Sequence, residues 1–203
     1  MTEVSVVDYG IGNTGSICNM FRKLRIEADV VSTEQAVLRA NRLILPGIGA
    51  FDACMGALDS SGLRASVLHF AATQRPLLGI CVGMQMLTLA SEEGNSTGLG
   101  LICARTRRFS GDGDLRIPHM GWNTVKWSAP EHPLARGLAE DCRFYFVHSY
   151  RVICDFPANS LADCSYGGEF SAAIGSGNIS GVQFHPEKSH RFGLQLLRNF
   201  ALS

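Results

Sequence analysis

One cysteine in this chain has a setting that suits covalent chemistry. Cys81 lies in Gly79-Ile80-Cys81-Val82-Gly83, after an apolar run and before a helical pattern. This is the cysteine counterpart of the G-x-S-x-G turn, where flanking glycines clear space for a nucleophile on strained backbone. At a helix N-terminus the thiolate, which is the attacking species, is also favoured. The pattern predicts a nucleophile; the alternative is a buried structural cysteine in a strand-to-helix turn.

A base for this thiol is available much later in the chain, in His185-Pro186-Glu187. Pro186 favours an extended backbone at His185, and residues i and i+2 of an extended chain point to the same side. We therefore expect Glu187 to accept a hydrogen bond from one imidazole nitrogen while the other nitrogen faces the thiol. On its own, His185 could equally be a structural histidine.

An acyl intermediate also requires hydrogen-bond donors for its oxyanion. The N–H group of Val82, directly after the cysteine, is one candidate. The segment Pro46-Gly47-Ile48-Gly49 ends a neighbouring strand and could supply the Gly49 N–H group as the second donor. The alternative for this segment is a plain glycine turn.

A second glycine-rich turn, Gly10-Ile11-Gly12-Asn13-Thr14-Gly15, matches G-x-G-x-x-G between a strand and a helix. It could bind a nucleotide, but the nearby Asp29 precedes the apolar pair Val30-Val31 and so lies at the wrong end of its strand. The alternative is a tight turn that needs glycine for backbone freedom. Asn13 would be exposed where open α/β sheets bind ligands.

The elements that must position these residues alternate between strands and helices in the first half. The pattern predicts an α/β fold with a mostly parallel sheet covered by helices on both faces. After about Gly98 we expect antiparallel strands and hairpins, and then a closing helix over 189–201. One domain, 1–203, is expected. The expected strands are 3–8, 28–31, 42–46 and 76–80, the helices 16–24, 62–73 and 82–90, and the β-rich segments 102–109, 116–127, 143–154, 160–166 and 170–184.

Composition argues against several other classes of function. The 203 residues carry 18 Lys+Arg and 18 Asp+Glu, so no basic surplus exists for nucleic acid. No apolar run of roughly 18 residues predicts a membrane span. Residues 1–8 lack the features of a signal peptide. The seven cysteines form no C-x-x-C pair and the histidines lack zinc-site spacing, so we expect reduced thiols, a cytoplasmic protein and no metal.

The residues around the cysteine and the histidine resemble those of the class I (triad) glutamine amidotransferases. Within that family the chain is similar to the glutaminase subunits of imidazole glycerol phosphate synthase, essentially from end to end. The motifs that carry this resemblance are Gly79 to Gln85, Val182 to Ser189, Asp8 to Asn13, Leu45 to Phe51, Pro118 to Asn123 and Phe144 to Tyr150.

The resemblance implies a reaction. Cys81 would attack the side-chain amide of glutamine, His185 would protonate the leaving ammonia and then activate water, and Glu187 would orient His185. The residues that the resemblance assigns to glutamine binding are Gln85, Glu93, Ser149 and Tyr150. No metal or organic cofactor is implied.

The resemblance also implies a partner. Ammonia would pass to a (β/α)8-barrel cyclase subunit, in a heterodimer that makes imidazole glycerol phosphate and an aminoimidazole carboxamide ribotide in histidine biosynthesis. The residues that would face this partner are Asn13, Trp122, Tyr145 and Lys188.

Two departures from the family pattern leave other acceptors open. Thr14 and Gly15 stand where the family usually has an apolar and then a basic residue, and residues 189–193 resemble paralogues that feed ammonia to sugar-modifying enzymes of surface polysaccharide synthesis. A γ-glutamyl hydrolase would keep the triad, but Gln85 and the partner-facing motifs argue against it. A nucleotide-binding module using the Gly10 turn would make no use of Cys81.

Overall fold

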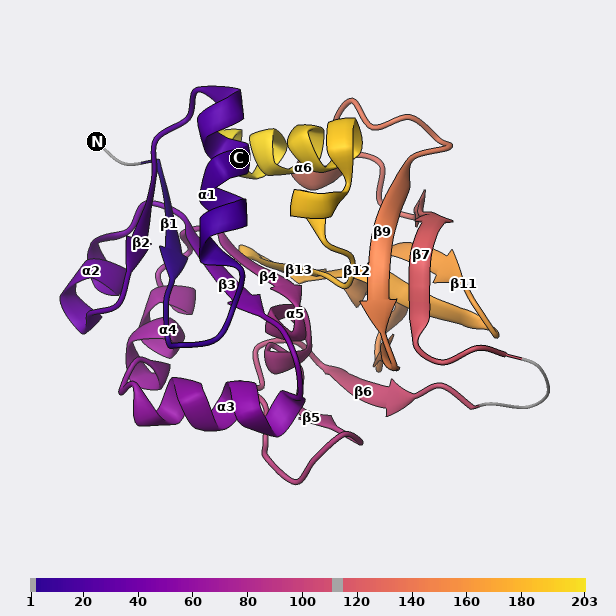
Figure 1. The fold of residues 1–203 in the computed structure, drawn as a ribbon, viewed down its shortest axis with the longest axis horizontal. Helices are drawn as coiled ribbons and strands as arrows, with labels where there is room; N and C mark the ends of the chain where they lie inside the picture. The colour runs from indigo at the N-terminus through magenta and orange to yellow at the C-terminus, as the bar shows by residue number, and fades with distance from the viewer. Residues whose placement is uncertain (1–2, 111–114) are drawn as a thin grey trace.

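A mixed β-sheet forms the centre of the computed structural model, which describes residues 3–110 and 115–203 (Figure 1). Of residues 1–8, which are expected to lack the features of a signal peptide, the first two lie outside these ranges. The main strands follow in the order β2 (Ala28–Val31), β1 (Val4–Val7), β3 (Leu43–Gly47), β4 (Leu77–Cys81), β13 (Ile179–Val182), β12 (Glu169–Ser176), β10 (Tyr150–Cys154), β6 (Ala104–Arg108) and β5 (Ala90–Ser91). Off this path, β11 (Ser160–Ser165) pairs with β12, and β8 (Lys126–Trp127) pairs with β11. The expected α/β architecture, mostly parallel in the first half, is confirmed.

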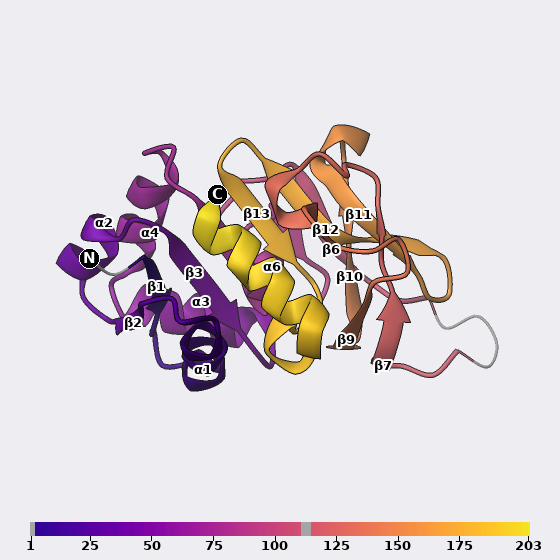
Figure 2. The same cartoon turned by 90° about the horizontal axis from the view of Figure 1, so that it is seen from above.

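The parallel part of the sheet is built from β1 (Val4–Val7), β2 (Ala28–Val31), β3 (Leu43–Gly47), β4 (Leu77–Cys81) and β13 (Ile179–Val182). The strands β1, β3 and β4 are buried along their whole length, as expected for a sheet covered on both faces. Helices α1 (Thr14–Leu24) and α6 (His190–Leu202) pack together over one face. Helices α3 (Phe51–Ser60) and α4 (Arg64–Ala71) lie on the opposite face (Figures 1 and 2).

The C-terminal half is largely antiparallel, as predicted. The strands β6 (Ala104–Arg108), β10 (Tyr150–Cys154), β11 (Ser160–Ser165) and β12 (Glu169–Ser176) extend the main sheet, together with the two-residue strands β5 (Ala90–Ser91) and β8 (Lys126–Trp127). The strands β7 (His119–Thr124) and β9 (Arg143–His148) form a separate antiparallel pair. Short 3-10 turns are η1 (Pro133–Ala135), η2 (Pro157–Asn159) and η3 (Pro186–Lys188).

One strand of this half departs from the prediction. Segment 170–184 forms the antiparallel pair β12 and β13, but β13 also runs parallel to β4, with Val182 in register with Ile80, where only antiparallel strands were expected. β13 therefore completes the parallel part of the sheet. Since Cys81 follows Ile80 directly, and His185 comes three residues after Val182, this register brings the two candidate catalytic residues to the same edge of the sheet.

One helix prediction needs correction, and two helices were not predicted. The helix predicted over 82–90 ends at Met86 as the five-residue α5 (Val82–Met86), because residues 98–104 hydrogen-bond with the backbone of Leu87 and Leu89. Helix α2 (Glu34–Arg39) was missed, although Thr33 caps it by accepting from the Ala36 N–H group. Helix α3 was missed despite its buried residues at helical spacing, because the glycine in its middle weakens the pattern.

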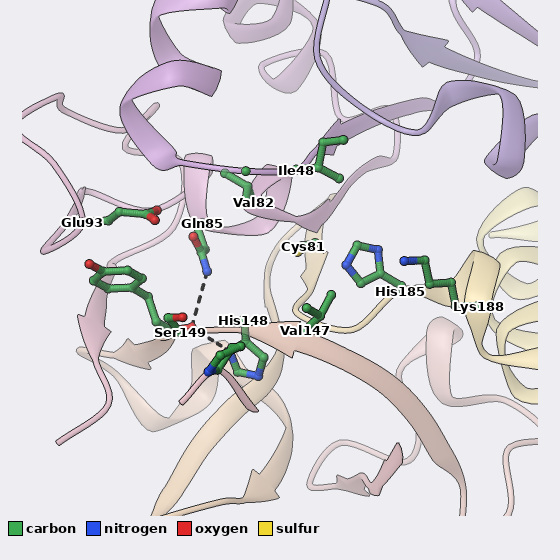
Figure 3. Close-up of a pocket in the computed structure, with 13 residues that line it drawn as sticks. Ile48, Cys81, Val82, Gln85, Glu93, Val147, His148, Ser149, His185 and Lys188 are labelled. Atoms are coloured by element: carbon green, nitrogen blue, oxygen red, sulfur yellow. Dashed lines mark hydrogen bonds between the residues drawn. The ribbon is translucent and has the colours of Figure 1, made fainter. Parts of the chain in front are cut away.

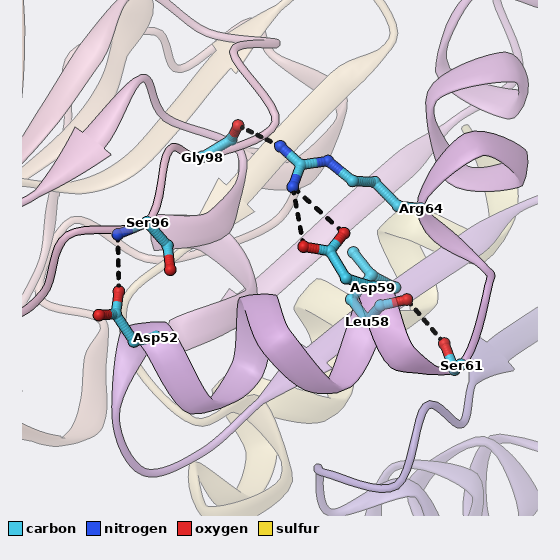
Figure 4. A network of polar contacts seen from close by, with 7 residues as sticks. All are labelled: Asp52, Leu58, Asp59, Ser61, Arg64, Ser96 and Gly98. Atoms are coloured by element: carbon cyan, nitrogen blue, oxygen red, sulfur yellow. Dashed lines mark hydrogen bonds and ion pairs between the residues drawn. The ribbon is translucent and has the colours of Figure 1, made fainter.

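Polar contacts fix the position of α3, which directly follows the Gly49 segment (Figure 4). Asp52 in the first turn accepts hydrogen bonds from the N–H groups of Asn95 and Ser96, at 2.9 and 3.0 Å. At the other end, Arg64 binds Asp59 and donates to the Gly98 carbonyl. The loop over 95–98 is thus held to both α3 and α4.

The close packing of α5 on β3 generates a stability prediction. A methyl group at Gly83 would overlap the backbone carbonyl of Leu45, which cannot turn aside as a side chain could. We expect Gly83→Ala to lower the free energy of unfolding by about 3 kcal/mol in urea denaturation. Gly56→Ala is the matched control: it lies in the exposed middle of α3 with open space, and should raise stability by about 0.5–1 kcal/mol. Equal effects of the two substitutions would contradict this account.

Candidate active site

The thiol of Cys81 stands on strained backbone at the end of β4. Its φ of 56° and ψ of −113° are rare for a residue with a side chain. Added side chains at the flanking glycines would collide with backbone: a Cβ at Gly79 would lie 2.6 Å from the Gly83 carbonyl oxygen, and one at Gly83 would overlap the Leu45 carbonyl oxygen. The glycines therefore permit both the turn and its packing, as the pattern predicted.

His185 and Glu187 form a buried pair beside this thiol. The Nδ1 and Oε1 atoms are 2.8 Å apart, and the side chains are only 4% and 2% exposed. His185 is extended, as predicted, but Glu187 reaches it through the η3 turn rather than along an extended chain, so our reason for the contact was wrong. The His185 N–H group binds the Tyr145 carbonyl, and the Ser189 hydroxyl accepts from the Tyr145 N–H group and donates to the His185 carbonyl.

The electrostatics of His185 favour its charged form. Burial alone would lower the pKa of His185, but hydrogen bonds with Cys81 and Glu187, together with their charges, outweigh burial and raise the pKa to about 10. Among the residues that the structure describes, the second carboxylate oxygen of Glu187 is buried without a hydrogen-bond partner, and the first lies 2.8 Å from the imidazole. A thiol, an imidazole and a carboxylate thus lie in the order that nucleophilic catalysis needs.

A cavity of about 440 Å³ opens in front of the thiol (Figure 3). Of the residues predicted to do chemistry or bind glutamine, all but Glu187, which lies behind His185, line it. Four others that the sequence did not single out also line it. The lining residues are Ile48, Gly49, Cys81, Val82, Gln85, Glu93, Pro118, Val147, His148, Ser149, Tyr150, His185 and Lys188.

Amide groups connect the wall of the cavity to the thiol. The Gln85 Nε2 group donates to Gln183 Oε1 at 3.0 Å and lies 3.5 Å from the Tyr150 carbonyl oxygen. Gln183 in turn directs its Nε2 group towards the Cys81 sulfur, at 3.8 Å. Gln183 is fully buried and was missed, because nothing in the local sequence marks it as different from a core position before His185.

The candidate oxyanion donors come from two neighbouring elements. Val82 begins α5, and Gly49 has a φ of +83°, with open space where a Cβ would be. Glu93 accepts a hydrogen bond from the Phe51 N–H group at 2.8 Å, so this cavity residue also holds the first turn of α3, just beyond Gly49. The segment from Gly49 to α3 is therefore fixed at its far end by a carboxylate.

Three of the four predicted partner-facing residues gather beside the cavity. Trp122 lies edge-on to Tyr145, its register partner across β7 and β9, and the Lys188 ammonium lies 5.6 Å from the Tyr145 ring centre. The same side of β7 exposes Met120 by 62% and Trp122 by 39%. Asn13 lies apart from these three in sequence, directly before α1, but α1 packs against the turn η3 that carries Lys188.

The glycine turn near the start has a structural explanation. The Asp8 carboxylate accepts from the Gly10 N–H group, and Gly12, at a φ of +137°, packs so tightly that a Cβ would lie 2.8 Å from the Pro46 Cγ atom. Glycine is thus required here for packing against β3, and the turn needs no nucleotide to account for it.

Comparison with known proteins fits this geometry. A family model described as "Glutamine amidotransferase class-I" matches residues 5–203. The chain belongs to this family. Among curated class I amidotransferase relatives, the imidazole glycerol phosphate synthase subunit HisH 2 of Methanococcus maripaludis is 48% identical, over 97% of this chain and 98% of the relative. The subunit HisH 2 of Pseudomonas aeruginosa is 46% identical, over 97% and 98%.

Solved structures show the same amidotransferase fold at lower identity. The structure of PurLQS from Thermotoga maritima has a TM-score of 0.74 and 18% identity, and covers 97% of this chain and 96% of that one. The glutaminase domain of Trypanosoma brucei CTPS, with bound acivicin, has a TM-score of 0.68 and 15% identity, and covers 98% and 94%.

Three further observations concern the described residues. Over 3–110 and 115–203, no helix combines the length and the apolar character needed to cross a bilayer. Within the same ranges, no three or more His, Cys, Asp or Glu side chains gather as a metal-binding group. The cysteines in these ranges are free thiols.

The pair formed by His185 and Glu187 generates a prediction for the pKa of His185. In Glu187→Gln the neutral amide no longer stabilises the imidazolium, while burial still disfavours it, so the pKa should fall well below about 10. Titration of the His185 ring by NMR measures this change. Glu92→Gln, an exposed carboxylate paired with Arg107, is the matched control and should leave the His185 pKa unchanged. An unchanged pKa in Glu187→Gln would show that the carboxylate does not hold the charge.

Proposed function

We propose that this amidotransferase hydrolyses glutamine to glutamate and ammonia as the glutaminase subunit of an imidazole glycerol phosphate synthase. The observation that carries the proposal is the arrangement of Cys81 and His185 on the wall of an open cavity, with Glu187 bound to His185. The backbone of Cys81 is strained, as a nucleophile turn requires. The curated relatives, similar over nearly the full length of both chains, are named as subunits of that synthase.

The geometry supports a two-step reaction. The Cys81 thiolate attacks the side-chain carbonyl of glutamine, and the tetrahedral intermediate collapses to a thioester when His185 gives its proton to the leaving ammonia. Neutral His185 then takes a proton from water, whose hydroxide attacks the thioester and releases glutamate. The carboxylate of Glu187 holds the imidazole at 2.8 Å throughout and stabilises its charged form.

The proposed oxyanion donors are the N–H groups of Val82 and Gly49. Both residues line the cavity, and a single donor of this kind typically contributes about a hundredfold or more in rate. Gly49 has a positive φ, and glycine adopts both signs of φ readily. The peptide that carries the Gly49 N–H group can therefore rotate more easily than it could at a residue with a side chain.

The proposed glutamine-binding residues surround the remainder of the cavity. At about 440 Å³ it falls within the range of small-molecule sites and suits one amino acid. The residues are Gln85, Glu93, Ser149 and Tyr150. Of these, Glu93 brings the negative charge that an α-ammonium group would seek.

The name of the relatives implies a partner subunit in the synthase complex. We infer that the partner is a cyclase of the (β/α)8-barrel type, which receives the ammonia and forms imidazole glycerol phosphate and an aminoimidazole carboxamide ribotide. The proposed docking surface is the aromatic pair of exposed Trp122 and half-buried Tyr145, with Lys188 and Asn13. A cytoplasmic location fits the free thiols, and the proposed steps use no cofactor.

Glutamate release from glutamine, with and without the cyclase subunit and its nucleotide substrate, tests this proposal. We expect a low basal rate, a large rise with the partner, and loss of both in Cys81→Ala. Cys103→Ala removes an exposed thiol instead and should retain activity. Turnover that survives in Cys81→Ala would eliminate this nucleophile. Turnover that depends on Cys81 but ignores the cyclase would point to another acceptor, such as a sugar-modifying enzyme, which the relatives' names do not favour.

A further inference from the structure

Two buried histidines next to the cavity have no part in the proposed chemistry. His119 on β7 and His148 on β9 are register partners, 3% and 6% exposed. The His119 Nδ1 and His148 Nε2 atoms are 2.9 Å apart. Two rings in such contact need matched tautomers, because one nitrogen must donate and the other accept.

The direction of this hydrogen bond is set from one end by Asn123. The Asn123 Oδ1 atom accepts from the Thr124 N–H group at 2.8 Å, and Nδ2 donates to the Ser165 carbonyl at 3.1 Å. These backbone partners fix which end of the amide is nitrogen. The Nδ2 group also lies 3.3 Å from His119 Nε2, so that this ring nitrogen accepts and the ring proton belongs on Nδ1.

A carbonyl sets the same direction from the other end. The His148 Nδ1 atom lies 2.7 Å from the Tyr150 carbonyl oxygen, which can only accept, so Nδ1 carries the proton and Nε2 is free to accept from His119. Both rings are then neutral. Burial favours this state: it lowers the pKa of His119 to about 4 and that of His148 to about 3.

This line of hydrogen bonds ends in the cavity. His148, Ser149 and Tyr150 all line it, and the Tyr150 carbonyl that accepts the hydrogen bond from His148 also lies 3.5 Å from the Gln85 Nε2 atom. Residue 149 separates β9 from β10. On the β6 side, the Ser149 carbonyl accepts from the Phe109 N–H group at 3.3 Å and Tyr150 pairs with Arg108. The imidazole of His148 adds a side-chain contact to this segment through the Tyr150 carbonyl.

We propose that Asn123, His119 and His148 are positioning residues, which hold the segment 148–150 in the conformation that binds glutamine. This inference rests on the proposed function and adds residues to it that do not carry out the bond-making steps. The hydrogen bonds of these three residues begin on β7, whose opposite side exposes Met120 and Trp122. They therefore connect the strand that carries Trp122, part of the proposed docking surface, to the segment 148–150.

Packing and hydrogen bonding at His119 can be separated by substitution. The ring stacks between Tyr166 and Phe146, with centroids at 3.9 and 4.8 Å. Phenylalanine at this position would keep the stacking and lose the donor. Asparagine would lose the ring, but its amide nitrogen stands where Nδ1 stands and can still donate to His148.

The test compares His119→Phe with His119→Asn in glutamine hydrolysis by the complex with the cyclase subunit. We expect His119→Phe to raise the KM for glutamine about tenfold with kcat changed less than about twofold, because His148 Nε2 is left buried without a donor. We expect His119→Asn to stay within about twofold of wild type in KM. Any other ranking, including equal effects of both substitutions, overturns the proposal.

A second measurement needs no variant. Long-range ¹H–¹⁵N NMR spectra of the wild-type chain at pH 7 should show both His119 and His148 as the Nδ1–H tautomer, and the Nε2–H tautomer at either ring overturns the proposal. Failure of the proposed function looks different, because wild type itself would then release no glutamate with or without the partner. The folded state of each variant is checked by thermal denaturation.

Discussion

The backbone at Cys81 is the constraint on which the rest of the site depends. A residue with a side chain is held at a φ of 56°, between a buried strand and a five-residue helix. Such a strained conformation persists only where the packing around it leaves no room for a relaxed one. Here α5 lies against β3 and β4 so closely that Gly47, Gly79 and Gly83 admit no side chain. The tight packing that strains the turn also directs the thiol into the cavity.

The arrangement of Cys81 and His185 also depends on the order and direction of the strands. His185 reaches Cys81 because β13 enters the sheet parallel to β4 and in register with it. The turn η3 then brings the Glu187 carboxylate behind the imidazole, and Ser189 ties that turn to β9 through Tyr145. As a result, the His185 imidazole, the Glu187 carboxylate and the cavity-lining segment of β9 are held by one set of contacts.

Local patterns in the sequence predicted the parts of the site that local chemistry determines. The strained cysteine turn and the extended His185 need particular neighbours, and these neighbours can be read from the residues. The direction of β13, the role of Gln183 and the pairing of His119 with His148 could not be predicted, because they depend on which strands become neighbours. The helix over 82–90 was predicted too long for the same reason: its C-terminal part is replaced by contacts with residues 98–104. Helix α3 could have been predicted, because its apolar residues follow a helical period.

The seven cysteines of this chain allow a direct test of the central claim, that the strained thiol is the one that attacks glutamine. The chain is incubated with an electrophilic glutamine analogue such as a diazo-ketone, and the labelled cysteine is identified by peptide mass spectrometry. We expect one adduct, on buried Cys81, that excess glutamine prevents, while exposed Cys103 stays unmodified by the analogue. An adduct on Cys103 or on another of the six remaining thiols, with Cys81 unmodified, would contradict it.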